Sequence, residues 1–254
     1  MTHTVDNYHL LTYDAIDSTN EEAKRLALSG GQHGAVCWAK KQTNGKGRLN
    51  RKWVSEEGNL YCSFLLKPQH LVKDFTQIPF VAALAVARAI NPVFEEKNAI
   101  SLKWPNDILL NDKKLGGILV ETVNAQSKFP WVVVGIGLNI EHFPKDTSLA
   151  ATSLKDAGVE IISAKIILSR IMNCFFPLMD EWEDKGFDDI KNEWEKHAAY
   201  KQEKVSFKQN DMSAQGTFIG INYDGECIIK AEDDTLHSFQ AGDLTLRKID
   251  AACY

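Results

Sequence analysis

A change in hydrophobic pattern close to Tyr200 is the feature that most constrains the fold. Before Tyr200, apolar runs of strand length alternate with longer segments of helical spacing. Beyond it the chain consists of short alternating runs separated by turn residues, with Asp224-Gly225 as a strong hairpin signal. The pattern predicts a domain of mixed helices and strands over residues 1–203, followed by a small β-barrel over residues 204–254.

The first domain is expected to alternate strands with helices. Ser18-Thr19-Asn20-Glu21 has the form of a capping box and predicts a helix that ends at about Leu28. Further helices are predicted over Pro79–Phe94, Ala164–Trp182 and Phe187–Tyr200. Strands are predicted over Ala35–Lys41, Asn59–Leu66, Ser101–Trp104, Ile108–Leu110, Leu115–Thr122 and Trp131–Asn139. In the small domain they are predicted over Val205–Lys208, Ala214–Asn222, Glu226–Ala231, Leu236–Ala241 and Leu244–Arg247.

Composition excludes several classes of protein but names no activity. The 254 residues include 29 Lys and Arg and 34 Asp and Glu, a formal net charge of −5, which disfavours general polyanion binding. The five cysteines lack Cys-x-x-Cys spacing and the seven histidines are scattered, so we expect reduced thiols and no metal-ligand residues. The sequence shows no signal-peptide pattern, and its apolar runs are too short to cross a bilayer, so we expect a cytoplasmic protein without a membrane partner.

The segment from Gln42 to Trp53 combines glycines with cationic side chains. Between Gly30 and Ser55 there are six Lys and Arg residues and no acidic residue. Glycine lets backbone amides approach an anion, and Arg and Lys neutralise phosphate, so the segment indicates a phosphate-binding loop. A solvated basic loop fits the same composition. A P-loop is excluded because no Gly-Lys-Ser/Thr occurs, and a dinucleotide fingerprint fails at Asn50.

Two further segments carry candidate ligand-binding residues. Lys103-Trp104-Pro105-Asn106-Asp107 lies across a predicted hairpin turn, Asn111-Asp112-Lys113-Lys114, from the stretch Lys114–Glu121. We therefore expect Lys103 and Lys114 on or beside adjacent antiparallel strands, from which they could project into one site, although a hairpin with surface lysines is the alternative. The third segment, Gly135-Ile136-Gly137-Leu138-Asn139, ends a buried strand with no helix after it, which weakens a Rossmann interpretation and leaves room for a flat ligand.

Together these segments resemble the biotin protein ligases. The family's Gly-Arg-Gly-Arg-x-Gly-Arg-x-Trp loop is similar to Gly45–Trp53, with Lys46 in place of Arg and Asn50 in place of Gly. Its other motifs, Ser-Thr-Asn, Lys-Trp-Pro-Asn-Asp, Lys-Leu-x-Gly-Ile-Leu-x-Glu and Gly-x-Gly-x-Asn, match Ser18–Asn20, Lys103–Asp107, Lys114–Glu121 and Gly135–Asn139. The resemblance covers nearly the whole chain. Because Asn tolerates left-handed backbone, we expect the turn at position 50 to be kept.

The resemblance implies an α+β fold, with a mixed-sheet, class II synthetase-like catalytic domain and a small C-terminal SH3-like β-barrel. It implies ATP-dependent attachment of biotin, through biotinyl-5′-AMP, to a lysine of the biotin carboxyl carrier domain of a carboxylase. ATP and biotin would be substrates, together with Mg²⁺. The motifs begin at Ser18, too early for an N-terminal DNA-binding domain, so we expect the short form of the ligase without specific DNA binding. A lipoate or octanoyl ligase is the nearest alternative, and a monomer and a homodimer both remain open.

The resemblance also assigns roles to individual residues. The expected catalytic residues are Lys114, Arg48 and Arg51. The expected biotin-binding residues are Ser18, Thr19, Gln42, Gly45, Lys46, Arg48, Lys114, Gly117 and Gly135. The expected ATP-binding residues are Arg48, Arg51, Trp53, Asn106, Lys114 and Asn139.

Lys114 is predicted to bridge the biotin carboxylate and the α-phosphate of ATP. Asp107 is left with two alternatives, orienting Lys103 or orienting the incoming lysine, and core packing is the alternative role for Trp53 and Trp104. The loop over residues 42–58 is predicted to be mobile without ligand and to order over the adenylate, which would shield the anhydride from water.

Overall fold

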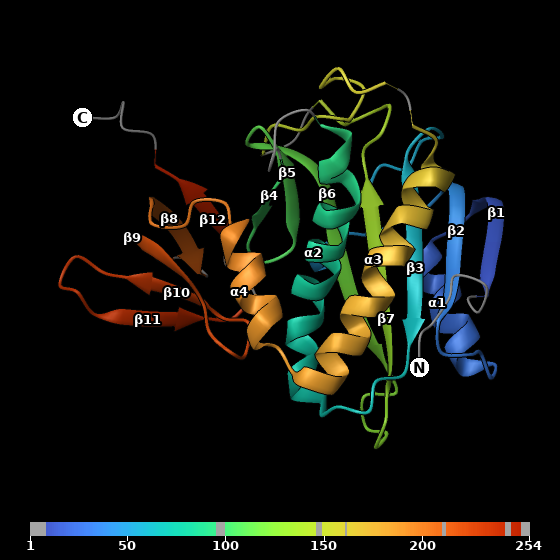
Figure 1. Ribbon diagram of the computed structural model, residues 1–254, viewed down its shortest axis with the longest axis horizontal. Helices are drawn as coiled ribbons and strands as arrows, with labels where there is room; N and C mark the ends of the chain where they lie inside the picture. Colours follow the sequence, from blue (N-terminus) through green and yellow to red (C-terminus); the bar gives the residue numbers. More distant parts are fainter. Residues whose placement is uncertain are drawn as a thin grey trace.

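The computed structural model describes residues 9–94, 100–145, 149–160, 162–209, 212–241 and 245–249. Its main body is a seven-stranded sheet in the order β1-β2-β3-β7-β6-β5-β4 (Figure 1). The strands are β1 (Leu10–Ile16), β2 (Ala35–Gln42), β3 (Leu60–Leu66), β4 (Ile100–Lys103), β5 (Asp107–Leu110), β6 (Lys113–Val123) and β7 (Trp131–Leu138). β1 and β2 run parallel, whereas each of the other neighbouring pairs is antiparallel. The predicted α+β class with a mixed sheet is confirmed.

Helices cover both faces of this sheet. The helices are α1 (Thr19–Leu28), α2 (Ile78–Ile90), α3 (Ala164–Lys185) and α4 (Asp188–Lys196), the last of which packs against α2 and β9, and the short 3₁₀ turns are η2 (Arg48–Asn50), η3 (Val72–Gln77) and η4 (Asn91–Val93). α2 and α3 lie side by side on one face (Figure 1). Successive side chains of a strand point to opposite faces, so Phe64 of β3 packs with α2 and α3 while Leu65 packs with Ala23 and Ala27 of α1. α1 therefore lies on the face opposite α2 and α3.

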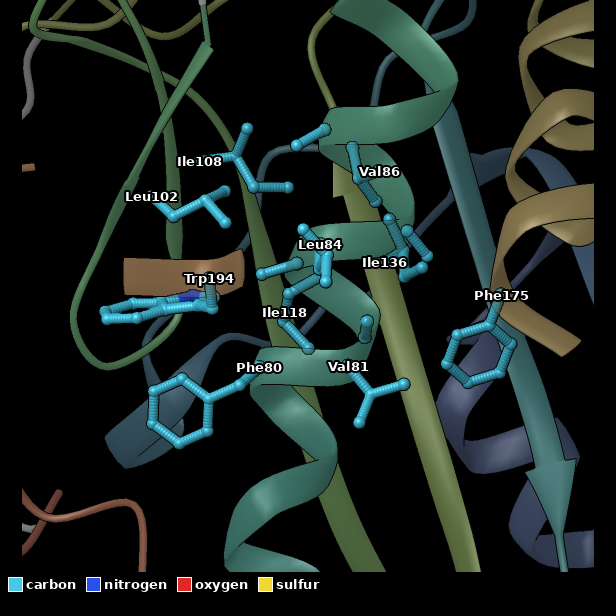
Figure 2. Close-up of a cluster of buried hydrophobic side chains, with 14 of the residues drawn as sticks. Phe80, Val81, Leu84, Val86, Leu102, Ile108, Ile118, Ile136, Phe175 and Trp194 are labelled. Carbon is cyan, nitrogen blue, oxygen red and sulfur yellow. The ribbon is translucent and has the colours of Figure 1, made fainter. Parts of the chain in front are cut away.

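The main core lies between the sheet and α2 and α3. Figure 2 shows side chains of α2, among them Leu84, beside Ile118 of β6 and Ile136 of β7. Almost every residue of α2 is buried, and the helix begins with proline at its first turn, where the missing N–H costs no hydrogen bond. The apolar segment Val72–Val93 is long and apolar enough to cross a membrane by length and composition, but most of it is buried inside the protein, as in the core helix of a globular domain.

The last part of the chain forms a second, five-stranded antiparallel sheet in the order β11-β10-β9-β8-β12. Its strands are β8 (Lys204–Gln209), β9 (Met212–Ile221), β10 (Cys227–Lys230), β11 (Leu236–Phe239) and β12 (Thr245–Lys248). The turn at Gly225, between β9 and β10, packs against the main domain, since its carbonyl accepts a hydrogen bond from the buried Trp104 indole (3.0 Å). The predicted hairpin at Asp224-Gly225 is confirmed, and the small all-β part is consistent with the predicted SH3-like domain.

Several local expectations need correction. β1 was not predicted, and the predicted helices over Pro79–Phe94 and Phe187–Tyr200 end earlier, at Ile90 and Lys196. The predicted capping box is wrong as a hydrogen-bonding motif. Ser18 is the N-cap residue of α1, but its side chain makes no cap hydrogen bond, and Glu21 instead pairs with Lys24 and Lys46.

Candidate active site

A cavity of about 640 Å³ opens on the face of the sheet that carries α1. Strands β6 and β7 pass beneath it, the first turn of α1 closes one end, and the segment after β2 covers it. With the exception of Gly45, every residue assigned to the site from the sequence lines this cavity: Ser18, Thr19, Gln42, Lys46, Arg48, Arg51, Trp53, Asn106, Lys114, Gly117, Gly135 and Asn139. Segments far apart in the sequence thus converge on one place.

Glycines make the floor of the cavity thin. Gly117 of β6 and Gly137 of β7 are cross-strand partners, and the Trp53 indole lies on them. A Cβ on Gly137 would lie 2.7 Å from Trp53 Nε1, so a side chain there would displace the indole. Within the described part of the chain the buried Trp53 Nε1 has no hydrogen-bond partner. An orphaned buried donor is costly in a protein, and this one belongs to a residue that lines the cavity.

The basic segment forms a tight turn. Lys46 and Lys52 form a β-bridge, and the Gly47 N–H donates to the Arg51 carbonyl (2.7 Å). Asn50 has φ of 57°, so the expected left-handed turn is confirmed; Leu49, at 53°, shares it, which the sequence did not predict. Lys46 reaches Glu21 at the start of α1 (2.6 Å), which ties the loop to the helix.

Gly45 does not line the cavity. A Cβ at this position would lie 2.5 Å from Ser55 Oγ and 2.6 Å from the Trp53 carbonyl oxygen. Glycine is therefore required here by the close approach of two chain segments. The predicted contact of Gly45 with biotin stays a prediction.

Two lysines share one carboxylate at the cavity. Asp107 at the start of β5 lies 2.5 Å from Lys114 Nζ and 3.7 Å from the buried Lys103 Nζ. The two lysines do converge, but their strands, β4 and β6, are not adjacent as expected, since β5 lies between them. Lys114 Nζ also lies 5.5 Å from the centre of the Trp53 ring, within cation–π range. Lys103 and Lys114 thus bring two cations to the cavity lining, which suits an anionic ligand.

Asn106 and Asn139, the two asparagines predicted to bind ATP, donate hydrogen bonds to backbone carbonyls. Asn139 is buried, and its amide donates to the carbonyl of Thr152 (3.0 Å), while its own N–H bonds the Leu115 carbonyl (2.8 Å). Asn106 donates to the Ile118 carbonyl (2.6 Å) and accepts from Arg48 Nη1 (3.2 Å). Both residues therefore fix the strands that carry Lys114 and, through Asn106, one orientation of Arg48.

The end of the cavity beside α1 is polar. The Thr19 N–H donates to Gln42 Oε1 (2.8 Å), and Gln42 Nε2 donates to Ser55 Oγ (2.9 Å). Ser63 Oγ lies 2.8 Å from Thr19 Oγ1 and 2.6 Å from Asn20 Oδ1. No role was predicted for Asn20 or Ser63 from the sequence. Ser63 could have been noticed, because it is a small polar residue in the middle of the apolar run Leu60–Leu66.

The fold and this cavity define a class of proteins. Residues 13–139 match the profile of the biotin/lipoate A/B protein ligase family, and the chain belongs to that family. Within it, the chain is of the biotin protein ligase type, and its relatives support an enzyme that ligates biotin.

Three relatives illustrate this. The bifunctional ligase/repressor BirA of Bacillus subtilis (strain 168) is 33% identical over 232 residues, which are 89% of this chain and 70% of that protein. The biotin–[acetyl-CoA-carboxylase] ligase of Paracoccus denitrificans is 32% identical over 221 residues, 84% of this chain and 91% of that one. The structure of the Aquifex aeolicus biotin protein ligase in complex with biotin and ATP superposes with a TM-score of 0.83 at 30% identity, covering 95% of this chain and 99% of that chain.

Proposed function

We propose that the protein joins biotin to a lysine of a biotin carboxyl carrier domain in two steps. In the first, a biotin carboxylate oxygen attacks the α-phosphorus of ATP, the bond to the β-phosphate oxygen breaks, and biotinyl-5′-AMP and pyrophosphate form. In the second, the neutral amine of the carrier lysine attacks the acyl carbon, AMP leaves, and the amine loses a proton. Relatives named as carboxylase ligases support the choice of a carrier domain as partner.

The observation that carries this proposal is the position of Lys114. Its ammonium lies beside Asp107 and the Trp53 ring, directly over the Gly117 floor, where a Cβ would lie 3.7 Å from Nζ. A carboxylate and a phosphate repel each other, so a cation between them lowers the barrier to their reaction. We assign Lys114 to bridge the two anions, and Asp107 to hold Lys114 in place until they bind.

The nucleotide is assigned to the side of the cavity covered by the basic loop. Arg48 and Arg51 provide charge for the phosphates, and guanidinium groups match phosphate oxygens two at a time. The Trp53 indole, which lies on Gly117 and Gly137 beside Lys114, is assigned next to the nucleotide. Asn106 and Asn139 support that side through the backbone they hold. Ser18, Thr19, Gln42, Lys46, Gly117 and Gly135 are assigned to the biotin side.

The carboxylates that line the cavity are the candidate protein ligands for Mg²⁺. Asp107 and Asp112 are the acidic residues among those that line the cavity in the described part of the chain. Asp107 is already occupied by two lysines, which compete with a cation for its oxygens. Among the described residues, no three His, Cys, Asp or Glu side chains come together in a way that could hold a metal ion. Mg²⁺ enters the proposal as part of the substrate, bound to the phosphates of ATP.

We assign both steps to residues 1–203 and treat residues 204–254 as the separate small domain. The test is incubation with ATP and Mg²⁺ and either biotin or lipoate, scoring pyrophosphate release and the AMP conjugate, followed by addition of a carrier domain. The proposal predicts biotinyl-AMP and a biotinylated carrier. Turnover with lipoate and not with biotin would favour the alternative ligase, and specific DNA retardation at physiological salt would contradict a ligase without a DNA-binding function.

A further inference from the structure

We propose that Glu121 is a positioning residue that sets the direction of the hydrogen bonds at the polar end of the cavity, and thereby selects a ligand ring that carries N–H donors. The inference rests on the proposed function, because the polar end is where the biotin ring is assigned. Glu121 has no place in the roles derived above, and it lies outside the residues that line the cavity.

The geometry around Glu121 fixes one amide. Glu121 lies on β6 opposite Val133. This pair is the next one after Leu119 and Gly135 on the same face of the sheet. Its Oε2 accepts a hydrogen bond from Asn20 Nδ2 (2.8 Å), and its Oε1 accepts one from Lys24 Nζ (2.6 Å). A carboxylate has no proton to donate, so it holds the NH₂ end of Asn20 and turns the carbonyl end, Oδ1, away from itself.

Lys24 supports this arrangement by keeping Glu121 in place. Partial burial lowers the pKa of Lys24, but its hydrogen bonds to Glu121 and Glu21 outweigh this and raise the pKa above its usual value. The ammonium is therefore charged at neutral pH and pairs with the carboxylate from the outer side. Asn20 meets the same carboxylate from the inner side.

The direction set by Glu121 passes along a buried chain of hydroxyls. Asn20 Oδ1 carries no proton, so Ser63, 2.6 Å away, must donate to it. Ser63 has one proton, so toward Thr19 Oγ1, 2.8 Å away, its oxygen can then only accept. Gln42 Oε1 accepts the Thr19 N–H (2.8 Å) and lies 3.2 Å from Thr19 Oγ1 as a second acceptor, so the Thr19 hydroxyl proton stays within this network in either arrangement. Ser63 is completely buried and lies outside the cavity lining, whereas Thr19 and Asn20, although nearly completely buried, line the cavity and can meet a ligand there.

This direction decides what a ligand meets. With the Thr19 hydroxyl proton and the Asn20 amide protons committed to protein acceptors, the Thr19 hydroxyl and the Asn20 carbonyl oxygen retain lone pairs and offer acceptors. The ureido ring of biotin has two N–H groups that would satisfy them, whereas the dithiolane ring of lipoate has none and would leave buried acceptors unpaired. A site that hydrogen-bonds a polar group discriminates strongly against an analogue that lacks it. Glu121 would thus contribute to the choice between the two acids that this family uses.

The test replaces Glu121 by Gln, which has almost the same shape but can donate as well as accept, so residue 121 no longer excludes the inverted Asn20 amide and only the long contact from Asn20 Nδ2 to the Leu119 carbonyl (3.5 Å) opposes the inversion. Biotin and lipoate affinities are measured calorimetrically without ATP, and KM and kcat are measured by pyrophosphate release. We expect E121Q to raise the biotin Kd and KM about tenfold and to leave kcat at saturating biotin within about twofold. The ratio of lipoate Kd to biotin Kd should shrink by the same factor.

Two further variants separate positioning from general damage. Glu193→Gln removes a similarly exposed carboxylate that is paired with Arg88 far from the cavity, and should match the wild type in every binding measurement. Ser63→Ala interrupts the hydroxyl chain while leaving Glu121 and Asn20 paired, and its effect on the biotin Kd should not add to that of E121Q, because both break one chain.

E121Q that binds biotin within twofold of the wild type would overturn the inference, and so would an equal loss of affinity for biotin and lipoate. Additive effects of E121Q and Ser63→Ala would also contradict it. A wild-type protein that binds no biotin would instead overturn the proposed function and this inference with it, so the two failures are distinguishable.

Discussion

Gly135→Ala is predicted to destabilise the ligand-free protein through a single contact. A Cβ on Gly135 would lie 2.1 Å from Asn20 Oδ1, so the amide must move by roughly 1.3 Å to reach an ordinary contact of about 3.4 Å. Asn20 is held by Ser63 at 2.6 Å and by Glu121 at 2.8 Å, and neither hydrogen bond survives such a shift. Each lost buried hydrogen bond costs about 1–3 kcal/mol, and α1 can relax in part, so we expect the unfolding free energy to fall by about 2–4 kcal/mol.

Urea denaturation followed by tryptophan fluorescence measures this loss. Gly117→Ala is the matched control, because it is also a strand glycine on the cavity floor but its Cβ would lie no closer than 3.6 Å to any atom outside its immediate neighbours. That control should unfold within about 0.5 kcal/mol of the wild type. If Gly135→Ala were as stable as Gly117→Ala, Asn20 would not be fixed as described, and the argument for the polar end would fail.

Three further predictions concern the core, one half-buried histidine and the basic loop. Phe175→Ala should lower the unfolding free energy by about 3–5 kcal/mol in the same assay, because its fully buried ring packs 4.5 Å from that of Phe64; a loss below 1 kcal/mol would contradict the packing. Burial lowers the pKa of His197, so the unfolded chain binds more protons than the folded protein as the pH falls through about 6.5. The unfolding free energy should therefore drop between pH 7.5 and 5.5, and it should drop by more in the wild type than in His197→Gln. Parallel losses in the two proteins would refute this. Glu21→Gln removes the ion pair between Glu21 and Lys46, a surface pair worth at most about 1 kcal/mol, and should speed tryptic cleavage of the basic loop up to about fivefold. Biotin plus ATP should slow cleavage in the wild type and in the variant. Cleavage that these substrates do not affect would contradict ordering of the loop.

The location of the site was largely predictable from the sequence, because its residues come from short motifs at strand ends and in turns. The alternation of side chains along β6 and β7 places Gly117, Gly135 and Gly137 on one face, and the two lysine motifs flank a short hairpin. Asn50 kept its turn because Asn, like Gly, tolerates a positive φ. Such signals are local, and local signals are visible in a single sequence.

The remainder depends on contacts that no short pattern contains. Residues 10–16 are partly exposed on both sides of β1, so alternation was weak and the parallel pairing with β2 could not be predicted. Ser18 has the right type for an N-cap hydrogen bond but lines the cavity instead. The hydrogen bonds of Asn20 join it to Ser63, 43 positions along the chain, and to Glu121, 101 positions along. A network of that span appears only once the sheet has brought its strands together.

The most direct test of the central claim is biotin-dependent pyrophosphate release by Lys114→Ala. The matched control is Lys113→Ala, because Lys113 is the neighbouring, exposed lysine of β6 and does not line the cavity. We predict that the wild type and Lys113→Ala release pyrophosphate only when biotin is present, and that Lys114→Ala is slower by about 10²–10³-fold, the usual cost of removing a charge-stabilising group at the reacting atoms. Near-normal release by Lys114→Ala, or release by the wild type without biotin, would contradict the account.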